Sequence, residues 1–278
     1  MNKCIFPVAG YGTRFLPFTK AIPKEMLPIL NKPIIHYAVN EAIKAKMSEI
    51  VFVTNRGKEA IVDYFDRNIE LENIVTNAEG EKRLVEVNSI ISECDFFYTR
   101  QKLIKGLGHA VIAGEKIIGD ETFAVILVDD LCVENDGSSV IHNMKEIYDK
   151  TGCSVIGVMK VTPEQVSRYG IIDFTQTLGV YKYNVLKIAD LVEKPKKEDA
   201  PSNYAVIGRY VLQPKIFDLL RKTKPGKNDE IQLTDALRIL ARKGELLAYE
   251  FKGRRFDCGM IEGFVKATNY FYEKRDER

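Results

Sequence analysis

The 278-residue sequence lacks the features of membrane, secreted or nucleic-acid-binding proteins. No apolar run reaches the ~18 residues that a membrane-spanning helix needs. The first residues carry one lysine before a proline-interrupted strand, which is not the pattern of a signal peptide. The net charge is only +2, and no basic tail is present, so nucleic acid is not an expected partner. We therefore predict a cytoplasmic protein that acts without a membrane or a nucleic acid.

Cysteine and histidine are scarce, and their positions exclude several kinds of site. The five cysteines are scattered, and no two of them form a C-x-x-C pair, which favours reduced thiols over a disulfide framework. Only three histidines occur, none in the spacing of metal ligands, so a histidine-based metal centre is not expected. An apolar content of 45% over this length still allows a sizeable core.

The most familiar catalytic and nucleotide-binding motifs are also absent. The sequence has no G-x-S-x-G nucleophile motif and no P-loop pattern ending in Gly-Lys-Ser/Thr. In the G-Y-G stretch near the N-terminus, Phe15 stands where the dinucleotide fingerprint has its third glycine. A nucleotide site in this chain must therefore be built in another way.

A glycine-containing loop follows the first predicted strand. Residues 3–9 read as a short buried strand, and Gly10 and Gly12 come directly at its end. Glycines without a Cβ let backbone N–H groups approach an anion closely, and consecutive amides can form an anion nest. For the two glycines alone, an ordinary surface turn is the alternative interpretation.

Basic side chains follow these glycines within one short stretch. Arg14 offers a planar fork for phosphate oxygens, and Lys20 and Lys24 add point charges. Together with the loop amides, these cations predict a site that grips several phosphates, as in a nucleoside triphosphate.

Strand-like and helix-like segments alternate along the first half of the chain, and the second half is more mixed. The predicted strands are 3–9, 49–54, 95–100, 123–128, 153–161, 185–192 and 204–212. The predicted helices are 33–45, 58–65, 81–92, 107–118, 214–222, 232–243 and 261–274. Residues 68–77 are polar and poorly periodic. The pattern predicts a Rossmann-like α/β fold, with a mixed, mainly parallel sheet flanked by helices.

Acidic and polar residues end several of these strands, where ligands bind in open α/β sheets. Asp129 and Asp130 follow a buried strand and could hold Mg²⁺, which prefers one or two carboxylates plus waters and phosphate oxygens; a turn or helix-cap role is the alternative. Gln101 could pair with a base edge or be a solvated side chain. Glu193 and Lys194 could hold hydroxyls and a phosphate, or form a solvated charge pair before Pro195.

The motifs, taken together and in order, resemble those of a known family. They are A-G-Y-G-T-R-F-L-P-F-T-K, I-P-K-E-M-L-P-I, N-K-P, Gln101 with G-L-G-H-A, I-L-V-D-D, R-Y-G, V-E-K-P, A-V-I-G-R-Y, E-I-Q-L-T-D-A and F-D-C-G. This series is similar to that of the sugar-1-phosphate nucleotidyltransferases, and among them to the bacterial UTP–glucose-1-phosphate uridylyltransferases. The resemblance covers nearly the whole chain.

The resemblance implies an activity, a fold and a set of site residues. The expected reaction joins UTP and glucose 1-phosphate into UDP-glucose and pyrophosphate, with Mg²⁺ as cofactor, in a glycosyltransferase-A-like fold. The implied catalytic residues are Arg14, Lys24, Asp129 and Lys194, and the implied metal ligands are Asp129 and Asp257. The implied nucleotide-binding residues are Ala9, Gly10, Gly12, Thr13, Glu25, Gln101 and Gly106. The implied sugar-binding residues are Gly170, Glu193 and Val206.

No glycine-serine linker or composition shift separates the two halves of the chain, so we predict one domain over residues 1–278. Its nucleotide-binding part is expected at about 1–135, and its sugar-binding and C-terminal helical part at about 136–278. Members of the family form homodimers or homotetramers, and we expect one of these here. The attacking sugar phosphate is already anionic, so positioning and charge stabilisation, rather than a general base, are the expected source of catalysis.

Other interpretations remain open at this stage. The same reaction with dTTP or another nucleotide is one, although thymidylyl enzymes more often carry Lys-Gln where this chain has Lys24-Glu25. A non-catalytic nucleotide-sugar sensor is another, but such a protein would be expected to have lost Arg14, Lys24, Asp129 or Asp257. A metal phosphatase would need a denser carboxylate and histidine cluster. Val128 stands where the family often has proline or glycine, and the roles of Asp130 and His109 stay open.

Overall fold

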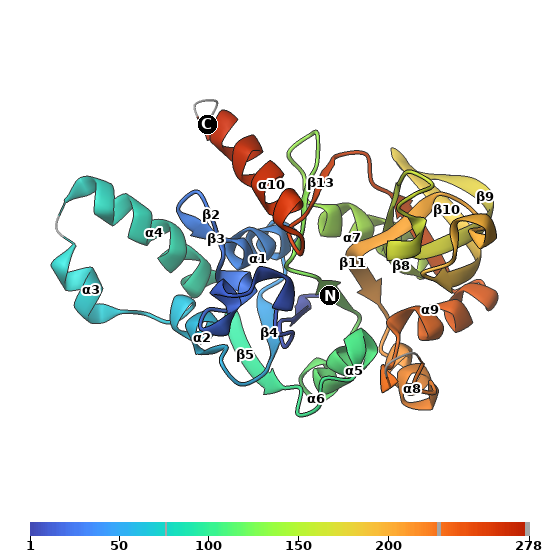
Figure 1. The fold of residues 1–278 in the computed structure, drawn as a ribbon, viewed down its shortest axis with the longest axis horizontal. Coiled ribbons are helices and arrows are strands. Elements are labelled where there is room, and N and C mark those ends of the chain that lie inside the picture. The colour runs from blue at the N-terminus through green and yellow to red at the C-terminus, as the bar shows by residue number, and fades with distance from the viewer. Residues whose placement is uncertain (76, 227–228, 276–278) are drawn as a thin grey trace.

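A central sheet of nine strands runs through the molecule, whose computed structural model describes residues 1–75, 77–226 and 229–275 (Figure 1). The strands are β1 (Lys3–Pro7), β4 (Glu49–Thr54), β5 (Asp95–Arg100), β6 (Phe123–Ile126), β8 (Ser154–Lys160), β9 (Gly170–Val180), β10 (Tyr183–Glu193), β11 (Tyr204–Leu212) and β12 (Leu246–Glu250). Their order is β5-β4-β1-β6-β11-β8-β12-β10-β9. The predicted mixed α/β fold is confirmed.

The two halves of the sheet pair differently. Strands β5, β4, β1 and β6 are all parallel neighbours. Of these, β1, β4 and β6 are apolar segments buried on both faces, as expected for a parallel sheet, whereas the edge strand β5 is largely exposed. Beyond β6 the pairings are antiparallel, except that β8 and β12 are parallel. The long β9–β10 hairpin forms the far edge, where many β9 side chains are exposed, so β9 lacks the continuous apolar run by which the other strands were predicted.

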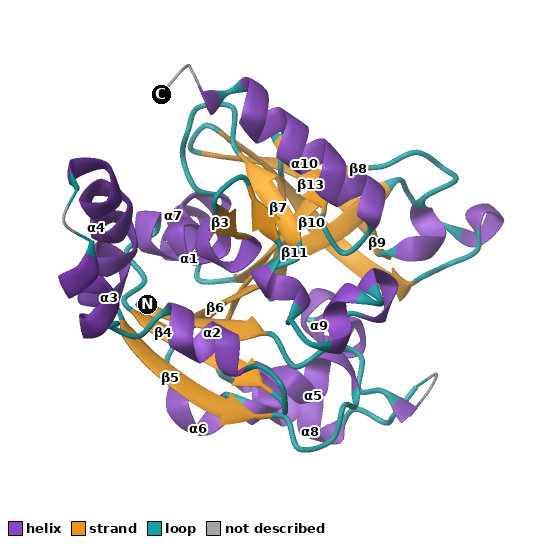
Figure 2. Ribbon diagram, turned by 60° about the vertical axis from the view of Figure 1, so that its left-hand side comes forward, coloured by secondary structure: helices purple, strands orange, loops and turns teal. Residues whose placement is uncertain are grey.

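The described chain contains ten α-helices, and most of them pack on the two faces of the sheet (Figure 2). They are α1 (Ile34–Lys44), α2 (Glu59–Tyr64), α3 (Ile69–Ile74), α4 (Ala78–Glu93), α5 (Gly106–Ala113), α6 (Glu115–Ile118), α7 (Val140–Thr151), α8 (Lys215–Lys222), α9 (Leu233–Arg242) and α10 (Ile261–Glu273). Two apolar clusters lie on opposite faces: α1, α7 and α10 contribute to one, and α5, α8 and α9 to the other. In β1, Cys4 and Phe6 join the first cluster and Ile5 the second, as strand alternation requires.

The helices differ from the prediction at three places, and one of these is α7, which the sequence did not predict. The predicted helix 107–118 is divided at Gly114, where a Cβ would lie only 2.7 Å from Cδ1 of Ile5, so the chain there passes very close to β1. The segment 68–77 contains α3, which begins at an Asn68 cap whose side chain accepts a hydrogen bond from the Leu71 amide. Its apolar residues are exposed, so no inward stripe marked it as a helix. Thr76 lies outside the described residues.

Two short antiparallel pairs complete the fold. Strands β2 (Pro28–Ile29) and β3 (Lys32–Pro33) precede α1, and β7 (Asp130–Val133) pairs with β13 (Arg254–Asp257). The β7–β13 pair brings a segment near the C-terminus beside the end of β6. All five cysteines are free thiols. No helix in the described ranges has the length and apolarity of a membrane span.

A fully buried arginine joins the two halves of the sheet at β11. Arg209 forms a two-pronged ion pair with Glu41 of α1, in which Nε donates to Oε1 at 2.9 Å and Nη2 to Oε2 at 2.8 Å. Its Nη1 atom donates to the carbonyl oxygens of Leu127 and Gly208. Every part of the guanidinium is therefore matched by an acceptor, which a buried charge requires.

Candidate active site

One cavity of about 500 Å³ gathers residues from both halves of the chain. Five of the predicted site residues line it: Arg14, Asp129, Lys194, Val206 and Asp257. Its other lining residues are Leu127, Asp130, Arg168, Tyr169, Gly208, Tyr210, Arg255 and Met260. The other predicted site residues are not part of this lining: Ala9, Gly10, Gly12, Thr13, Lys24, Glu25, Gln101, Gly106, Gly170 and Glu193.

The glycine-containing loop folds into three short 3₁₀ turns: η1 (Thr13–Phe15), η2 (Phe18–Lys20) and η3 (Lys24–Met26). Gly12 has a φ of +66°, and a Cβ there would lie 3.0 Å from Cβ of Lys24. The Thr19 hydroxyl donates to the Gly12 carbonyl at 2.8 Å and holds the turn. Gly10 instead faces open space, with no atom within 4 Å of an added Cβ. Ala9 before it is buried and Thr13 after it is exposed. Close packing against Lys24 therefore requires glycine at position 12, whereas the absence of a Cβ at Gly10 leaves the backbone there accessible.

Asp129 and Asp257 converge on Gly259. A Cβ on this glycine would lie 3.0 Å from Asp129 Oδ2, 3.1 Å from Asp257 Oδ1 and 3.6 Å from an Arg14 guanidinium nitrogen. The two carboxylate oxygens are therefore separated by no more than the sum of the first two distances. The β7–β13 pair explains the approach, because it places Asp257 directly opposite Asp130.

The two carboxylates have different electrostatic surroundings. Burial acts to raise the pKa of Asp129, but the Lys24 ammonium, whose Nζ lies 2.5 Å from Oδ2, outweighs it and holds that pKa below the usual range. Burial raises the pKa of Asp257, which Arg255 only partly offsets. Burial also acts to lower the pKa of Lys24, but the Asp129 carboxylate outweighs burial and raises the Lys24 pKa above its usual value. Asp129 is therefore the firmly ionised member of the pair.

Asp130 is a buried structural carboxylate rather than a solvent-facing one. Its Oδ2 accepts from the Gly208 amide at 2.7 Å, and its Oδ1 accepts from Arg255 Nε at 2.5 Å. Arg255 also donates to the Tyr169 hydroxyl at 3.1 Å and lies over the Tyr169 ring. The sequence prediction missed Arg255 and Tyr169; the only available signal was their position beside the F-D-C-G and R-Y-G motifs.

The base-binding candidates form a separate, well-packed turn. Gln101 is buried, and its amide nitrogen donates to the Gly106 carbonyl at 3.1 Å and lies 3.0 Å from Nδ1 of His109. Gln101 therefore keeps its side-chain carbonyl, but not its amide donor, for a base. Burial and Lys105 lower the pKa of His109, which leaves its Nδ1 an acceptor for Gln101 and gives the ring an orienting role. Gly106 has a φ of +82°, with Ile231 O only 3.0 Å from an added Cβ.

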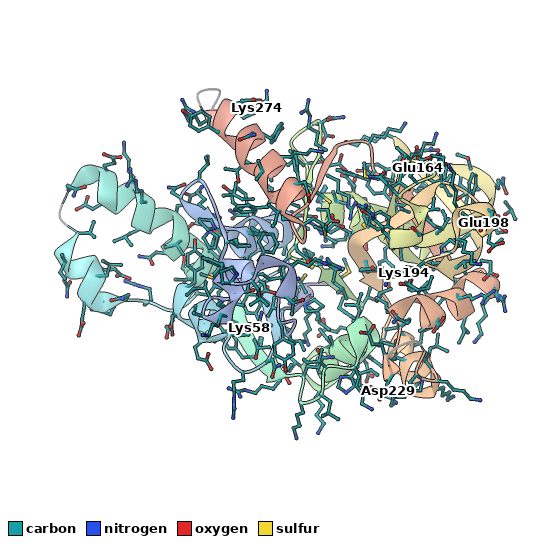
Figure 3. All side chains as sticks on the ribbon, in the orientation of Figure 1. Lys58, Glu164, Lys194, Glu198, Asp229 and Lys274 are labelled. Carbon is teal, nitrogen blue, oxygen red and sulfur yellow. The ribbon has the colours of Figure 1, made fainter. Side chains whose placement is uncertain are left out.

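Glu25 has a buried partner that the sequence did not reveal. Lys58, at the start of α2, donates to Glu25 Oε2 at 2.7 Å, and both side chains are almost inaccessible. Burial raises the pKa of Glu25 and lowers that of Lys58, and each group opposes the shift of the other. Oε1 of Glu25 is buried without a hydrogen-bond partner among the described residues. Lys58 lies in the N-terminal half of the chain, well away from Lys194 (Figure 3).

The sugar-side candidates meet at the end of the β9–β10 hairpin. Glu193 accepts a hydrogen bond from the Thr234 hydroxyl at 2.7 Å and forms an ion pair with Lys194 at 3.0 Å. A Cβ on Gly170 would lie 3.3 Å from Glu193 Oε2, so glycine gives the carboxylate its room. Lys194 is exposed and has a φ of +45°, an unusual backbone conformation for a lysine. Thr234, in the first turn of α9, is a further residue that was not among the predicted site residues.

The donor set at Asp129 and Asp257 fits a magnesium ion. In the described parts of the chain, no group of three or more His, Cys, Asp or Glu side chains is arranged to hold a metal. Mg²⁺ prefers one or two carboxylates, with its remaining positions filled by waters and phosphate oxygens. Asp129 and Asp257 provide two carboxylates, and Gly259 leaves space between them.

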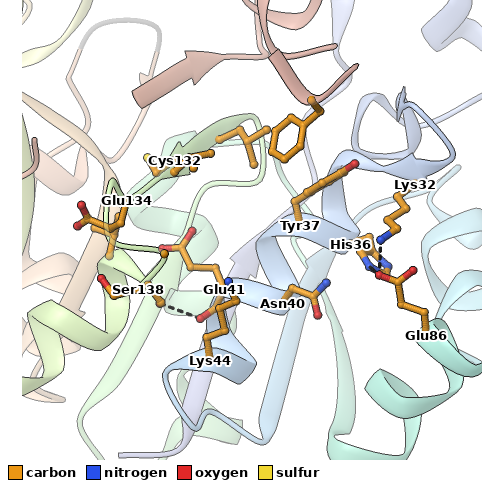
Figure 4. Close-up of a pocket in the computed structure, with 16 residues that line it drawn as sticks. Lys32, His36, Tyr37, Asn40, Glu41, Lys44, Glu86, Cys132, Glu134 and Ser138 are labelled. Carbon is orange, nitrogen blue, oxygen red and sulfur yellow. Dashed lines mark hydrogen bonds and ion pairs between the residues drawn. The ribbon is translucent and has the colours of Figure 1, made fainter. Parts of the chain in front are cut away.

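A second cavity of about 430 Å³ lies between α1, α7 and α10 and carries none of the predicted site residues (Figure 4). Its walls mix cations, acids and apolar groups, including Lys32, His36, Glu86 and Glu134. His36 lies against Tyr64, with Nδ1 2.9 Å from the hydroxyl oxygen. The convergent cations and carboxylates of the first cavity, not this one, match the predicted chemistry.

Sequence comparisons find related proteins over nearly the whole chain. The profile of the nucleotidyl transferase family matches residues 4–274. The chain is 52% identical over 273 residues to a UTP–glucose-1-phosphate uridylyltransferase of Pseudomonas aeruginosa, covering 98% of this chain and 96% of the relative. It is 50% identical over 277 residues to UTP–glucose-1-phosphate uridylyltransferase 2 of Staphylococcus saprophyticus, covering 100% of this chain and 93% of the relative.

Solved structures give the same result. A UDP-glucose pyrophosphorylase complexed with UDP-glucose has a TM-score of 0.90 and 51% identity, over 99% of both chains. A UTP-bound enzyme of this kind from Acinetobacter baumannii has a TM-score of 0.88 and 38% identity, over 98% of this chain and 93% of that one. The chain therefore belongs to the nucleotidyl transferase family, among the UTP–glucose-1-phosphate uridylyltransferases.

Proposed function

We propose that this protein transfers a uridylyl group from UTP to glucose 1-phosphate, giving UDP-glucose and pyrophosphate. The observation that carries the proposal is the cavity in which Arg14, Asp129, Asp257 and Lys194 meet, with Lys24 bound to Asp129. Two relatives of known structure are described as bound to UTP and to UDP-glucose.

The residues act by holding two polyanions end to end. Arg14 and Lys24 bind the triphosphate and stabilise the charge that develops on the leaving pyrophosphate. Lys194 binds the phosphate of glucose 1-phosphate, whose oxygen attacks the α-phosphorus in line. Asp129 and Asp257 are the proposed ligands of Mg²⁺, which when bound supplies a positive charge and a template for the phosphate oxygens.

The remaining residues position the two substrates. Glu193, held by Thr234, accepts hydrogen bonds from glucose hydroxyls, and Gly170 and Val206 border the sugar. Gln101 and Gly106 contact the uracil, Glu25 lies near the ribose, and Ala9, Gly10, Gly12 and Thr13 supply loop contacts to the nucleotide. Lys58 fixes Glu25 in place.

One assay tests the proposal. Pyrophosphate release is measured with glucose 1-phosphate and each of UTP, dTTP, CTP, ATP and GTP, with and without magnesium. We expect release with UTP that requires magnesium and that exceeds release with dTTP. Faster release with dTTP would favour the thymidylyl alternative, and no release with any nucleotide would favour a sensor.

We also propose a cytoplasmic enzyme that forms a homodimer or homotetramer and consists of one domain. The continuous nine-stranded sheet, in which β11 lies between β6 and β8, supports the single domain. Light scattering on the purified protein will give the oligomer size, and a monomer at assay concentration would contradict this expectation.

A further inference from the structure

The ammonium of Lys24 contacts Oδ2 of Asp129, which is the oxygen of that carboxylate that faces Asp257. Nζ of Lys24 is 2.5 Å from Oδ2 of Asp129. The same Oδ2 atom is the one that lies 3.0 Å from the Cβ position of Gly259, across which Asp257 Oδ1 lies at 3.1 Å. A cation bound between the two aspartates needs this oxygen, and so does Lys24.

The charged side chains around Asp129 Oδ2 neutralise one another without a metal ion. Two carboxylates, Asp129 and Asp257, face two cations, Lys24 and Arg14. A dication added without an anion would leave an excess of two positive charges in a partly buried site, which electrostatics disfavours. A dication that comes with a triphosphate is different, because the phosphates give Lys24 a new partner.

We propose that Lys24 and the divalent cation compete for Asp129 Oδ2, and that Lys24 leaves this oxygen for the triphosphate when the metal binds. The inference rests on the metal site in the proposed function. In the absence of nucleotide, Lys24 then prevents the metal from binding. When metal and nucleotide bind together, the Lys24 ammonium moves to the phosphates.

The local structure allows this movement. The backbone of Lys24 is held in η3, and the first two carbons of its side chain, Cβ and Cγ, pack against Gly12. The ammonium sits on a flexible four-carbon stem, and about a fifth of the side chain is exposed. A rotation of the stem is enough to move the charge from Asp129 toward the loop amides. Lys24 therefore needs no change of fold to exchange partners.

Manganese binding to the nucleotide-free protein tests the inference without measuring turnover. We expect Lys24→Met to bind Mn²⁺ about tenfold or more tightly than the unmodified protein, as followed by the electron paramagnetic resonance signal of free Mn²⁺. The double variant Lys24→Met with Asp129→Asn should lose the gain, because the metal then lacks its oxygen. Lys24→Gln provides a second variant if Lys24→Met does not fold.

Two matched variants separate competition from simple charge. Lys266→Met removes an exposed lysine of α10 and should leave Mn²⁺ affinity unchanged. Arg14→Met removes a cation beside the same point that does not hold Oδ2, and should give a smaller gain than Lys24→Met. An equal gain from Arg14→Met, or no gain from either Lys24 variant, would overturn the proposal. Because no substrate is present, this result is independent of which nucleotide the enzyme uses.

Discussion

Arg255 lies with its Nε 2.5 Å from Oδ1 of Asp130, and this buried pair stands between the proposed metal site and the sugar site. Arg255 is two residues before Asp257 on β13, and Asp130 follows Asp129. The pair also reaches Tyr169, which precedes the proposed sugar-binding Gly170. We therefore expect the geometry of both proposed substrate sites to depend on this one ion pair.

Replacement of Arg255 should reduce stability strongly. Arg255→Met leaves the buried Asp130 carboxylate without its cation, and we expect a loss of about 3–5 kcal/mol in the free energy of unfolding. Urea denaturation measures it. The double variant Arg255→Met with Asp130→Asn should recover part of this loss, and a double variant as unstable as the sum of the two single variants would contradict the pairing.

Substitution of Gly259 should impair metal use without unfolding the protein. In Gly259→Ala the new methyl group would lie 3.0 Å and 3.1 Å from the two aspartate oxygens, closer than ordinary contact. We expect the magnesium concentration for half-maximal activity to rise about tenfold, with little change in Tm. Gly179→Ala is the control, because a methyl group there meets nothing within 4 Å. An unchanged magnesium requirement would argue against this metal site.

Lys194 should be needed for the sugar phosphate far more than for UTP. Loss of a charge-assisted bond of about 1.5–3 kcal/mol predicts a KM for glucose 1-phosphate roughly 10- to 150-fold higher in Lys194→Ala. Lys194→Gly should show the same increase while fitting the φ of +45° more easily, which separates lost binding from backbone strain. Equal losses for both substrates would contradict the assignment.

His36 should make the protein sensitive to mild acid. Burial, with a further contribution from Lys32, lowers the pKa of His36 to about 4, whereas in the unfolded chain it is 6.5. Below pH 6.5 the unfolded state therefore binds a proton that the folded state does not, and stability falls until about pH 4. The loss attributable to His36 is on the order of a few kcal/mol. His36→Gln should lose less stability over this pH range in denaturation experiments, and a parallel loss in both proteins would exclude His36 as the cause.

The sequence was sufficient for the strands of the first half of the sheet. Strands β1, β4 and β6 are buried on both faces, so their apolar runs were visible, and β11 was predicted at its observed bounds. The family prediction was confirmed by the relatives. The individual roles of the site residues stay predictions, although the cavity gathers several of them.

What the sequence could not show depends on contacts between distant segments. Strands β7 and β13 have four residues each, too few for a period, and only their pairing brings Asp257 to Asp130. Lys58 and Arg255 became recognisable as site residues only through their buried carboxylate partners. One signal was available and was not used: Arg209 stands inside the apolar run of a buried strand, where a charge indicates an ion pair.

The Arg209–Glu41 pair also limits how this protein could be recombined. Glu41 belongs to the part that precedes residue 135 and Arg209 to the part that follows it, so each half would carry an uncompensated charge if expressed alone. A chimaera that joins the first half of this chain to the second half of a relative must keep both residues, or replace both by apolar ones. Exchange of substrate specificity by swapping halves is therefore constrained by two residues that do not themselves line the proposed substrate cavity.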